Sequence, residues 1–181
     1  MSIKSDIFDR AVKKEAKKNP RKQRFVTYEK AKSILLIYES NEKTDHAVNK
    51  IAQQLKKDGK EITIWGFVNA KKILEAPPEV KVFCRKDTNL FEKPNKKIIN
   101  EALATKFDLL IDLSLHTYLP LSYLVLYSNA TMKTGSKISK NNIYDFILDF
   151  KQSPDNKKTG LNEQSLFDEI IFYLKKIQTT D

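Results

Sequence analysis

The clearest strand signal in the chain is FDLLIDL, residues 107–113. A second run, SILLIY at residues 33–38, is apolar at nearly every position as well. Short runs of this kind are typical of strands that are buried on both faces of a parallel sheet. Neither reaches the roughly 18 apolar residues that a membrane-spanning helix needs. The sequence therefore predicts central sheet strands here and no membrane span.

Outward from these two runs, segments with strand character alternate with segments of helical spacing. Further strands are expected at residues 61–68, 80–84, 130–135 and 143–150, and helices at residues 43–58, 95–105, 119–128 and 161–177. Alternation of this kind predicts an α/β fold, a three-layer sandwich with a mostly parallel, Rossmann-like sheet and helices on both faces. We expect a basic N-terminal helix and arm over residues 1–32, followed by a single α/β domain over residues 33–181.

The composition argues against several kinds of site. With one cysteine, Cys84, the chain has no internal disulfide, and two histidines add too few soft ligands for a structural zinc site. The four glycines lack the spacing of a dinucleotide-binding fingerprint or a phosphate-binding loop. We therefore expect no metal, no cofactor and no catalytic residues. The first residues have no apolar signal core, which favours a cytoplasmic protein.

Positive charge is concentrated at the N-terminus. The chain of 181 residues has 33 Lys and Arg against 23 Asp and Glu, a net charge of +10. Residues 1–32 hold 11 of these cations and four of the acids, a net +7, which leaves +3 for residues 33–181. Such asymmetry is typical of a segment that contacts a polyanion.

Residues 3–18 have the spacing of an amphipathic helix that ends at Asn19-Pro20. Three roles are open for it: a solvated helix packed on the domain, a contact with phosphates, or a helix on a membrane surface. The apolar side is weak for lipid binding. A run of basic groups fits a polymer better than a metabolite, because each neutralised phosphate releases counterions. The residues predicted to bind RNA phosphates are Arg10, Lys13, Lys14, Lys17, Lys18, Arg21, Lys22 and Arg24.

A rival hypothesis places a ligand or active site at the carboxyl ends of the strands, where ligands bind in open α/β sheets. It predicts a small Rossmann-like enzyme or ligand-binding module for a nucleotide or sugar-nucleotide. The candidate residues of this site are Glu39, Asn41, Asp112, Ser114 and His116. Ser114 lacks the Gly-x-Ser-x-Gly elbow of a hydrolase nucleophile. A further possibility is a homodimer formed through the apolar helix at residues 119–128.

Two resemblances extend these interpretations. The chain resembles, over nearly its whole length, a family of uncharacterised proteins from Bacteroidota, which shares the basic arm, the 34–38 strand and the FDLLIDL run. Residues 107–135 are similar to a segment of heptosyltransferase-like glycosyltransferases, which implies a related fold. Some lineage-specific proteins of Bacteroidota lie on the ribosome. The leading hypothesis is therefore a non-enzymatic RNA-binding protein that associates with the ribosome and whose body stays folded when residues 1–24 are removed.

Overall fold

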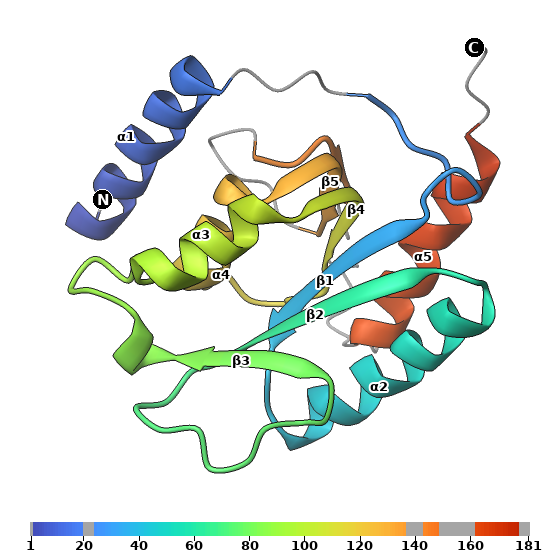
Figure 1. The fold of residues 1–181 in the computed structure, drawn as a ribbon, viewed down its shortest axis with the longest axis horizontal. Coiled ribbons are helices and arrows are strands. Elements are labelled where there is room, and N and C mark those ends of the chain that lie inside the picture. The colour runs from blue at the N-terminus through green and yellow to red at the C-terminus, as the bar shows by residue number, and fades with distance from the viewer. Residues whose placement is uncertain (1, 20–23, 137–142, 149–161, 178–181) are drawn as a thin grey trace, which may run out of the picture.

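The computed structural model describes residues 2–19, 24–136, 143–148 and 162–177. Its centre is a six-stranded sheet in which every neighbouring pair of strands is parallel, in the order β3-β2-β1-β4-β5-β6 (Figure 1). The strands are β1 (Ser33–Glu39), β2 (Glu61–Val68), β3 (Val80–Cys84), β4 (Lys106–Asp112), β5 (Asn129–Gly135) and β6 (Phe146–Ile147). The predicted α/β sandwich with a Rossmann-like sheet is confirmed.

The two apolar runs that predicted the sheet lie side by side at its centre. β1 pairs with β4 with Ile34 opposite Leu109 and Leu36 opposite Ile111, and all four side chains are fully buried. Helices cover both faces, so neither strand shows the alternation of a half-exposed strand. These central strands anchor the hydrophobic core.

One face of the sheet is covered by α2 (Glu42–Lys57) and α5 (Glu163–Lys176), which contact each other. α2 begins at a capping box, in which the Asn41 side chain accepts a hydrogen bond from the backbone N–H of Thr44. Its apolar stripe packs with Leu36 and with Leu174 of α5 in one core cluster. None of the predicted RNA-binding residues that the structure describes lies on this face.

The opposite face is covered by α3 (Lys96–Ala104) and α4 (Leu119–Tyr127). Every residue of α4 from Pro120 to Val125 is buried. The sheet, α3 and α1 (Ile3–Lys18) cover this helix within the chain, so it does not offer the exposed apolar surface that a homodimer would need. No helix in the described ranges is long and apolar enough to cross a membrane.

The predicted arm helix is present as α1, which ends at the predicted Asn19 boundary. Figure 1 shows it as the outermost element on this side, with α3 and α4 between it and the sheet. Its first turn lies near Pro120 at the start of α4, and Lys18 lies near Leu126 at the end of α4. α1 therefore runs in the same direction as α4 and forms an extra layer over it.

The C-terminal part is described less completely. Of the strand predicted at residues 143–150, only Phe146–Ile147 is a strand in the described residues, and positions 149 and 150 lie outside them. The polar stretch of the sequence at residues 153–160 also lies outside the described residues. The last predicted helix is present as α5 and begins at an Asn162 cap.

Candidate nucleic-acid interface

The N-terminal helix is held on the body by its apolar stripe. The Phe8 ring is buried and meets the Tyr123 ring of α4 edge-on, with the ring centroids 4.9 Å apart. Ala11 and Val12, one turn further on, are half-buried against the same cluster. The role of a helix packed on the domain, which was one of the three open roles, is thus filled by this side of α1.

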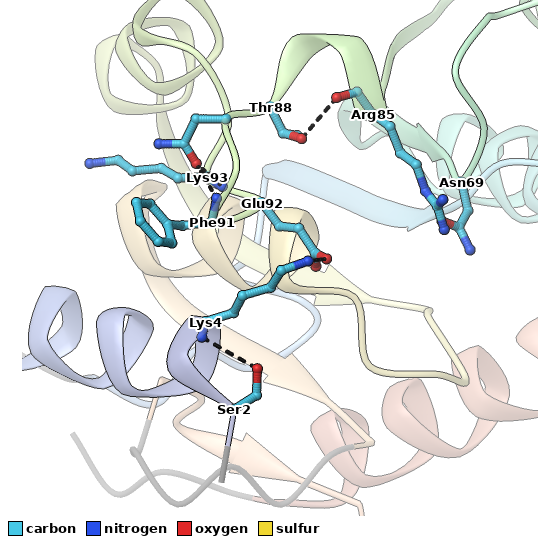
Figure 2. A network of polar contacts seen from close by, with 9 residues as sticks. Ser2, Lys4, Asn69, Arg85, Thr88, Phe91, Glu92 and Lys93 are labelled. Atoms are coloured by element: carbon cyan, nitrogen blue, oxygen red, sulfur yellow. Dashed lines mark hydrogen bonds and ion pairs between the residues drawn. The ribbon is translucent and has the colours of Figure 1, made fainter.

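An ion pair holds the first turn of α1 in place. The Lys4 ammonium donates to the Glu92 carboxylate in the loop between β3 and α3, with Nζ and Oε1 2.5 Å apart (Figure 2). The helix is also capped at its start, because the Ser2 hydroxyl accepts a hydrogen bond from the backbone N–H of Lys4. These contacts and Phe8 fix which side of the helix faces solvent.

The side that faces solvent is the basic one. All of the predicted phosphate-binding residues on α1 are exposed: Arg10, Lys13, Lys14, Lys17 and Lys18. Within the described part of the chain, none of the five forms an ion pair with a carboxylate. The helix is therefore packed on the body while these five cations stay unpaired with the acids of the described residues, and Lys4 at its start is the cation of α1 that pairs with a carboxylate there.

The charge of α1 is graded along its axis. Asp6 and Asp9 lie in the first half of the helix, whereas its last nine residues hold five cations and the single acid Glu15. The Glu15 carboxylate accepts a hydrogen bond from the Asn19 side-chain amide, with Nδ2 and Oε1 2.6 Å apart. Cations in the last turn also stabilise the helix through its dipole. The positive surface is therefore concentrated at the end of α1 that lies near the amino edge of the sheet.

The predicted arm continues beyond the helix. Arg24 is exposed. Arg21 and Lys22 lie outside the described residues, so their predicted role stays a prediction. The next residues return to the body: Tyr28 is buried, and its hydroxyl donates to the Asp58 carboxylate 2.5 Å away.

The rival site at the carboxyl ends of the strands is only partly assembled. Asp112 and Ser114 are in contact, and both are 2% exposed. The Asp112 carboxylate accepts hydrogen bonds from the Ser114 backbone N–H at 2.9 Å, from the Ser114 hydroxyl, and from the Tyr144 hydroxyl at 2.6 Å. Burial, and next the charge of Asp112, raise the pKa of Tyr144 well above its ordinary value. The buried Ser114 hydroxyl thus donates to a buried carboxylate, an arrangement that stabilises the fold.

In the described residues, no hydrogen bond joins the other three residues of the rival site to this pair. Asn41 caps α2 and closes its capping box. His116 is exposed, and in the described residues no hydrogen bond joins it to Glu39. Burial, followed by a hydrogen bond to Glu39, raises the pKa of Tyr118 to about 12.

Sequence reasoning missed a polar hollow beside this edge. It is a cavity of about 480 Å³ between the ends of β2 and β3, the start of α4 and the first turn of α1. The Arg85 guanidinium donates to the Asn69 side-chain oxygen 2.9 Å away, and Figure 2 shows this pair across from Lys4 and Glu92. No motif links residues 4, 69, 85 and 118 in the sequence. In the described residues, no group of three or more His, Cys, Asp or Glu could hold a metal ion.

Comparisons with known proteins give a family and no activity. No curated protein and no solved structure matches the chain. A family of unknown function, DUF6913, matches residues 4–177, a range that begins in α1 and ends at the last described residue. The basic helix is thus part of the matched unit. The chain belongs to DUF6913, a family of unknown function.

Proposed function

We propose that this protein binds RNA without catalysing a reaction, through the exposed cations of α1, and that in the cytoplasm it associates with the ribosome. The observation that carries the proposal is the orientation of α1. Phe8 is buried against the body while five cations between Arg10 and Lys18 face solvent without an ion pair in the described residues. A helix that served only to cover α4 would not need this charge.

The geometry favours contact with phosphates over reading of bases. The five cations span nine residues, from Arg10 to Lys18, which is about 12 Å along a helix axis and matches a short stretch of nucleic-acid backbone. The exposed face of α1 has no aromatic side chain on which a base could stack. Binding should therefore be weakly dependent on sequence and strongly dependent on salt.

The orientation of α1 decides how the proposal is tested. Removing residues 1–24 would uncover α4 and leave Tyr123 without its Phe8 partner, so a truncated chain would not isolate the effect of charge. Replacing Arg10, Lys13, Lys14, Lys17 and Lys18 by Gln removes the charge and keeps the buried stripe, because Gln and Lys have similar helix propensities. A matched control replaces five exposed lysines elsewhere on the body: Lys43, Lys50, Lys57, Lys71 and Lys72.

Both variants have the same net charge, so any difference between them is due to position. If five contacts follow the duplex rule of about 0.9 per phosphate, the affinity of the native protein for a hairpin RNA falls about 500-fold between 50 and 200 mM salt. The α1 variant should lose most of this salt dependence, and the control should keep it. Equal binding by the α1 variant and the native protein would contradict the proposal. Association with ribosomes is checked by co-sedimentation, which should occur in low salt and be lost in high salt.

A second candidate function rests on the 480 Å³ hollow near Arg85 and Tyr118. Its polar lining and its place at the carboxyl ends of β2 and β3 suit a small anionic ligand such as a nucleotide or sugar-nucleotide. A thermal-shift screen with these compounds tests it. A rise in melting temperature that Arg85→Gln abolishes would favour this function, and no rise with any compound would argue against it.

A further inference from the structure

A larger hollow lies at the opposite edge of the sheet, where α1 ends. It is a cavity of about 650 Å³ bounded by the end of α1, the end of α4 and the starts of β4 and β5. Three cations from different parts of the chain line it: Lys18 from α1, Arg24 from the arm, and Lys106 from the first position of β4. β4 and β5 are adjacent at this point, with Lys106 opposite Asn129.

The charge in this hollow is unbalanced. Among the described residues that line it, the single carboxylate is that of Glu15, which already accepts a hydrogen bond from the Asn19 amide. In the described part of the chain, none of Lys18, Arg24 and Lys106 forms an ion pair with a carboxylate, although the charge of Lys106 acts at longer range on Asp108, which is not part of the lining. The other polar residues of the lining are neutral: Asn19, Tyr127, Ser128, Asn129 and Thr131. Three cations against one engaged acid favour an anionic ligand.

Helix dipoles work against an anion here, because α1 and α4 both end at this edge with their carbonyl groups pointing toward it. At the end of both helices, lysine side chains offset the negative end of the helix dipole. Lys17 and Lys18 lie in the last turn of α1. The Nζ atom of Lys133, a residue that is 1% exposed, donates to the carbonyl oxygens of Val125 and Leu126 at the end of α4. A buried cation behind the hollow thus reduces the repulsion that a phosphate would meet.

The one aromatic ring at the rim is already occupied. Tyr127 lies nearly parallel to Tyr123, with an interplanar angle of 7°, and the Lys93 ammonium lies 5.1 Å from the Tyr127 ring centroid. Both contacts compete with a nucleotide base for the Tyr127 ring, whereas a phosphate needs only the cations.

We infer that this hollow binds a phosphate of the RNA backbone and that Lys106, a residue of the body, acts together with the cations of α1. This inference rests on the proposed function and deepens it, because it adds a defined phosphate-binding site to the charged face of α1. The backbone that follows the exposed face of α1 reaches the hollow at Lys18, which belongs to both surfaces. Lys106 and the rim of β5 then hold one phosphate at a defined place.

The test compares Lys106→Gln with Lys57→Gln in the full-length chain, using a hairpin RNA as the probe. Lys57 is exposed at the end of α2, on the opposite face of the sheet, so both changes remove one charge. Loss of one phosphate contact should lower the slope of log K against log salt by about 1 in Lys106→Gln and leave it unchanged in Lys57→Gln. Asn129→Glu, which puts a carboxylate at an exposed position on the rim, is a second variant and should weaken binding at least tenfold.

The outcomes separate this inference from the proposed function. If neutralising α1 weakens binding and both Lys106→Gln and Asn129→Glu bind like the native protein, the hollow is not a phosphate-binding site and the proposed function stands. If Lys106→Gln and Asn129→Glu weaken binding but the neutralised α1 does not, the hollow binds a phosphate without Lys18, and both the joint action of Lys106 with α1 and the proposed role of α1 are wrong. If the native protein shows no salt-dependent binding to the hairpin, both are overturned.

Discussion

The Phe8 ring stands perpendicular to the Tyr123 ring, with a 90° interplanar angle and 4.9 Å between centroids. This edge-to-face contact joins the N-terminal helix to the most deeply buried helix on its side of the sheet. Phe8 is 5% exposed and Tyr123 is fully buried. The basic helix is therefore attached to the body through a buried aromatic side chain, and its charged side chains face solvent.

Replacing Phe8 by Ala should therefore loosen α1 and lower the free energy of unfolding by about 3 kcal/mol, through lost burial and a cavity. Urea denaturation followed by circular dichroism measures this. The control is Ile3→Ala in the same helix, where the side chain is 73% exposed and the change should cost less than about 0.5 kcal/mol. Similar losses in the two variants would show that Phe8 is not the anchor.

The buried carboxylate of Asp112 depends on its donors. Tyr144→Phe removes the hydroxyl that donates to Asp112 at 2.6 Å and leaves a buried acceptor with fewer partners. The free energy of unfolding should fall by about 1–3 kcal/mol. Tyr173→Phe, at an exposed position on α5, is the control and should have little effect. A Tyr144→Phe variant as stable as the native protein would contradict this account of the carboxyl edge.

Removing the hydroxyl of Tyr123, in contrast, should raise the free energy of unfolding. Its hydroxyl is buried and has no hydrogen-bond partner among the described residues. Removing an unsatisfied buried hydroxyl while keeping the ring should stabilise the protein, by about 1 kcal/mol at neutral pH. Denaturation of Tyr123→Phe at pH 7 tests this, and a clear loss of stability would mean that the hydroxyl does have a partner.

The same residue predicts how stability changes in alkali. Burial, followed by the charge of Tyr127, raises the pKa of Tyr123 to about 12, whereas an unfolded tyrosine ionises near pH 10. From about pH 10 to 12 the unfolded chain releases a proton that the folded chain keeps, so stability falls as pH rises. Tyr123→Phe removes this contribution. Its advantage over the native protein should be larger at pH 11 than at pH 8, and a constant difference would contradict the prediction.

Asp108 should govern part of the acid sensitivity. Burial acts to raise the pKa of Asp108, but the backbone N–H groups of Ser33 and Lys32, the Ser33 hydroxyl and the charge of Lys106 lower it below the ordinary value. A carboxyl whose folded pKa is depressed contributes stability above its unfolded pKa, near 4, and loses it as pH falls through the folded value. Asp108→Asn should cost about 1–2 kcal/mol at pH 7.

The pH profile distinguishes this from a general loss of charge. Between pH 5 and 2 the stability of Asp108→Asn should fall less steeply than that of the native protein. Glu169→Gln, at an exposed position on α5, should follow the native profile. If Asp108→Asn and the native protein have parallel profiles, the contacts around Ser33 do not depend on the carboxylate charge.

Much of the fold could be read from local pattern. The FDLLIDL run became β4 and the SILLIY run became β1, because a strand buried on both faces needs apolar residues in succession. The boundary of α1 was also predictable, since Asn19-Pro20 follows its last residue. The short β6 was not predictable at its observed length, because the pattern at residues 143–150 does not show where pairing with β5 stops.

The candidate site was predictable only in part. The side of α1 that carries its cations follows from helical spacing, and the structure leaves those residues exposed. Lys106 was missed because it is isolated in the sequence and joins Lys18 only when β4 lies beside the end of α1. Tyr144 was missed for the same reason, since it lies 32 positions after Asp112.

The sequence by itself determined the strands, the helices and the uneven charge of this protein, because each depends on residues within a few positions of one another. Only the tertiary structure decided the strand order, the attachment of Phe8 to Tyr123 and the gathering of Lys18, Arg24 and Lys106 around one hollow. Those arrangements come from burying apolar surface between distant segments, and neighbouring residues along the chain do not encode which distant partner will cover them.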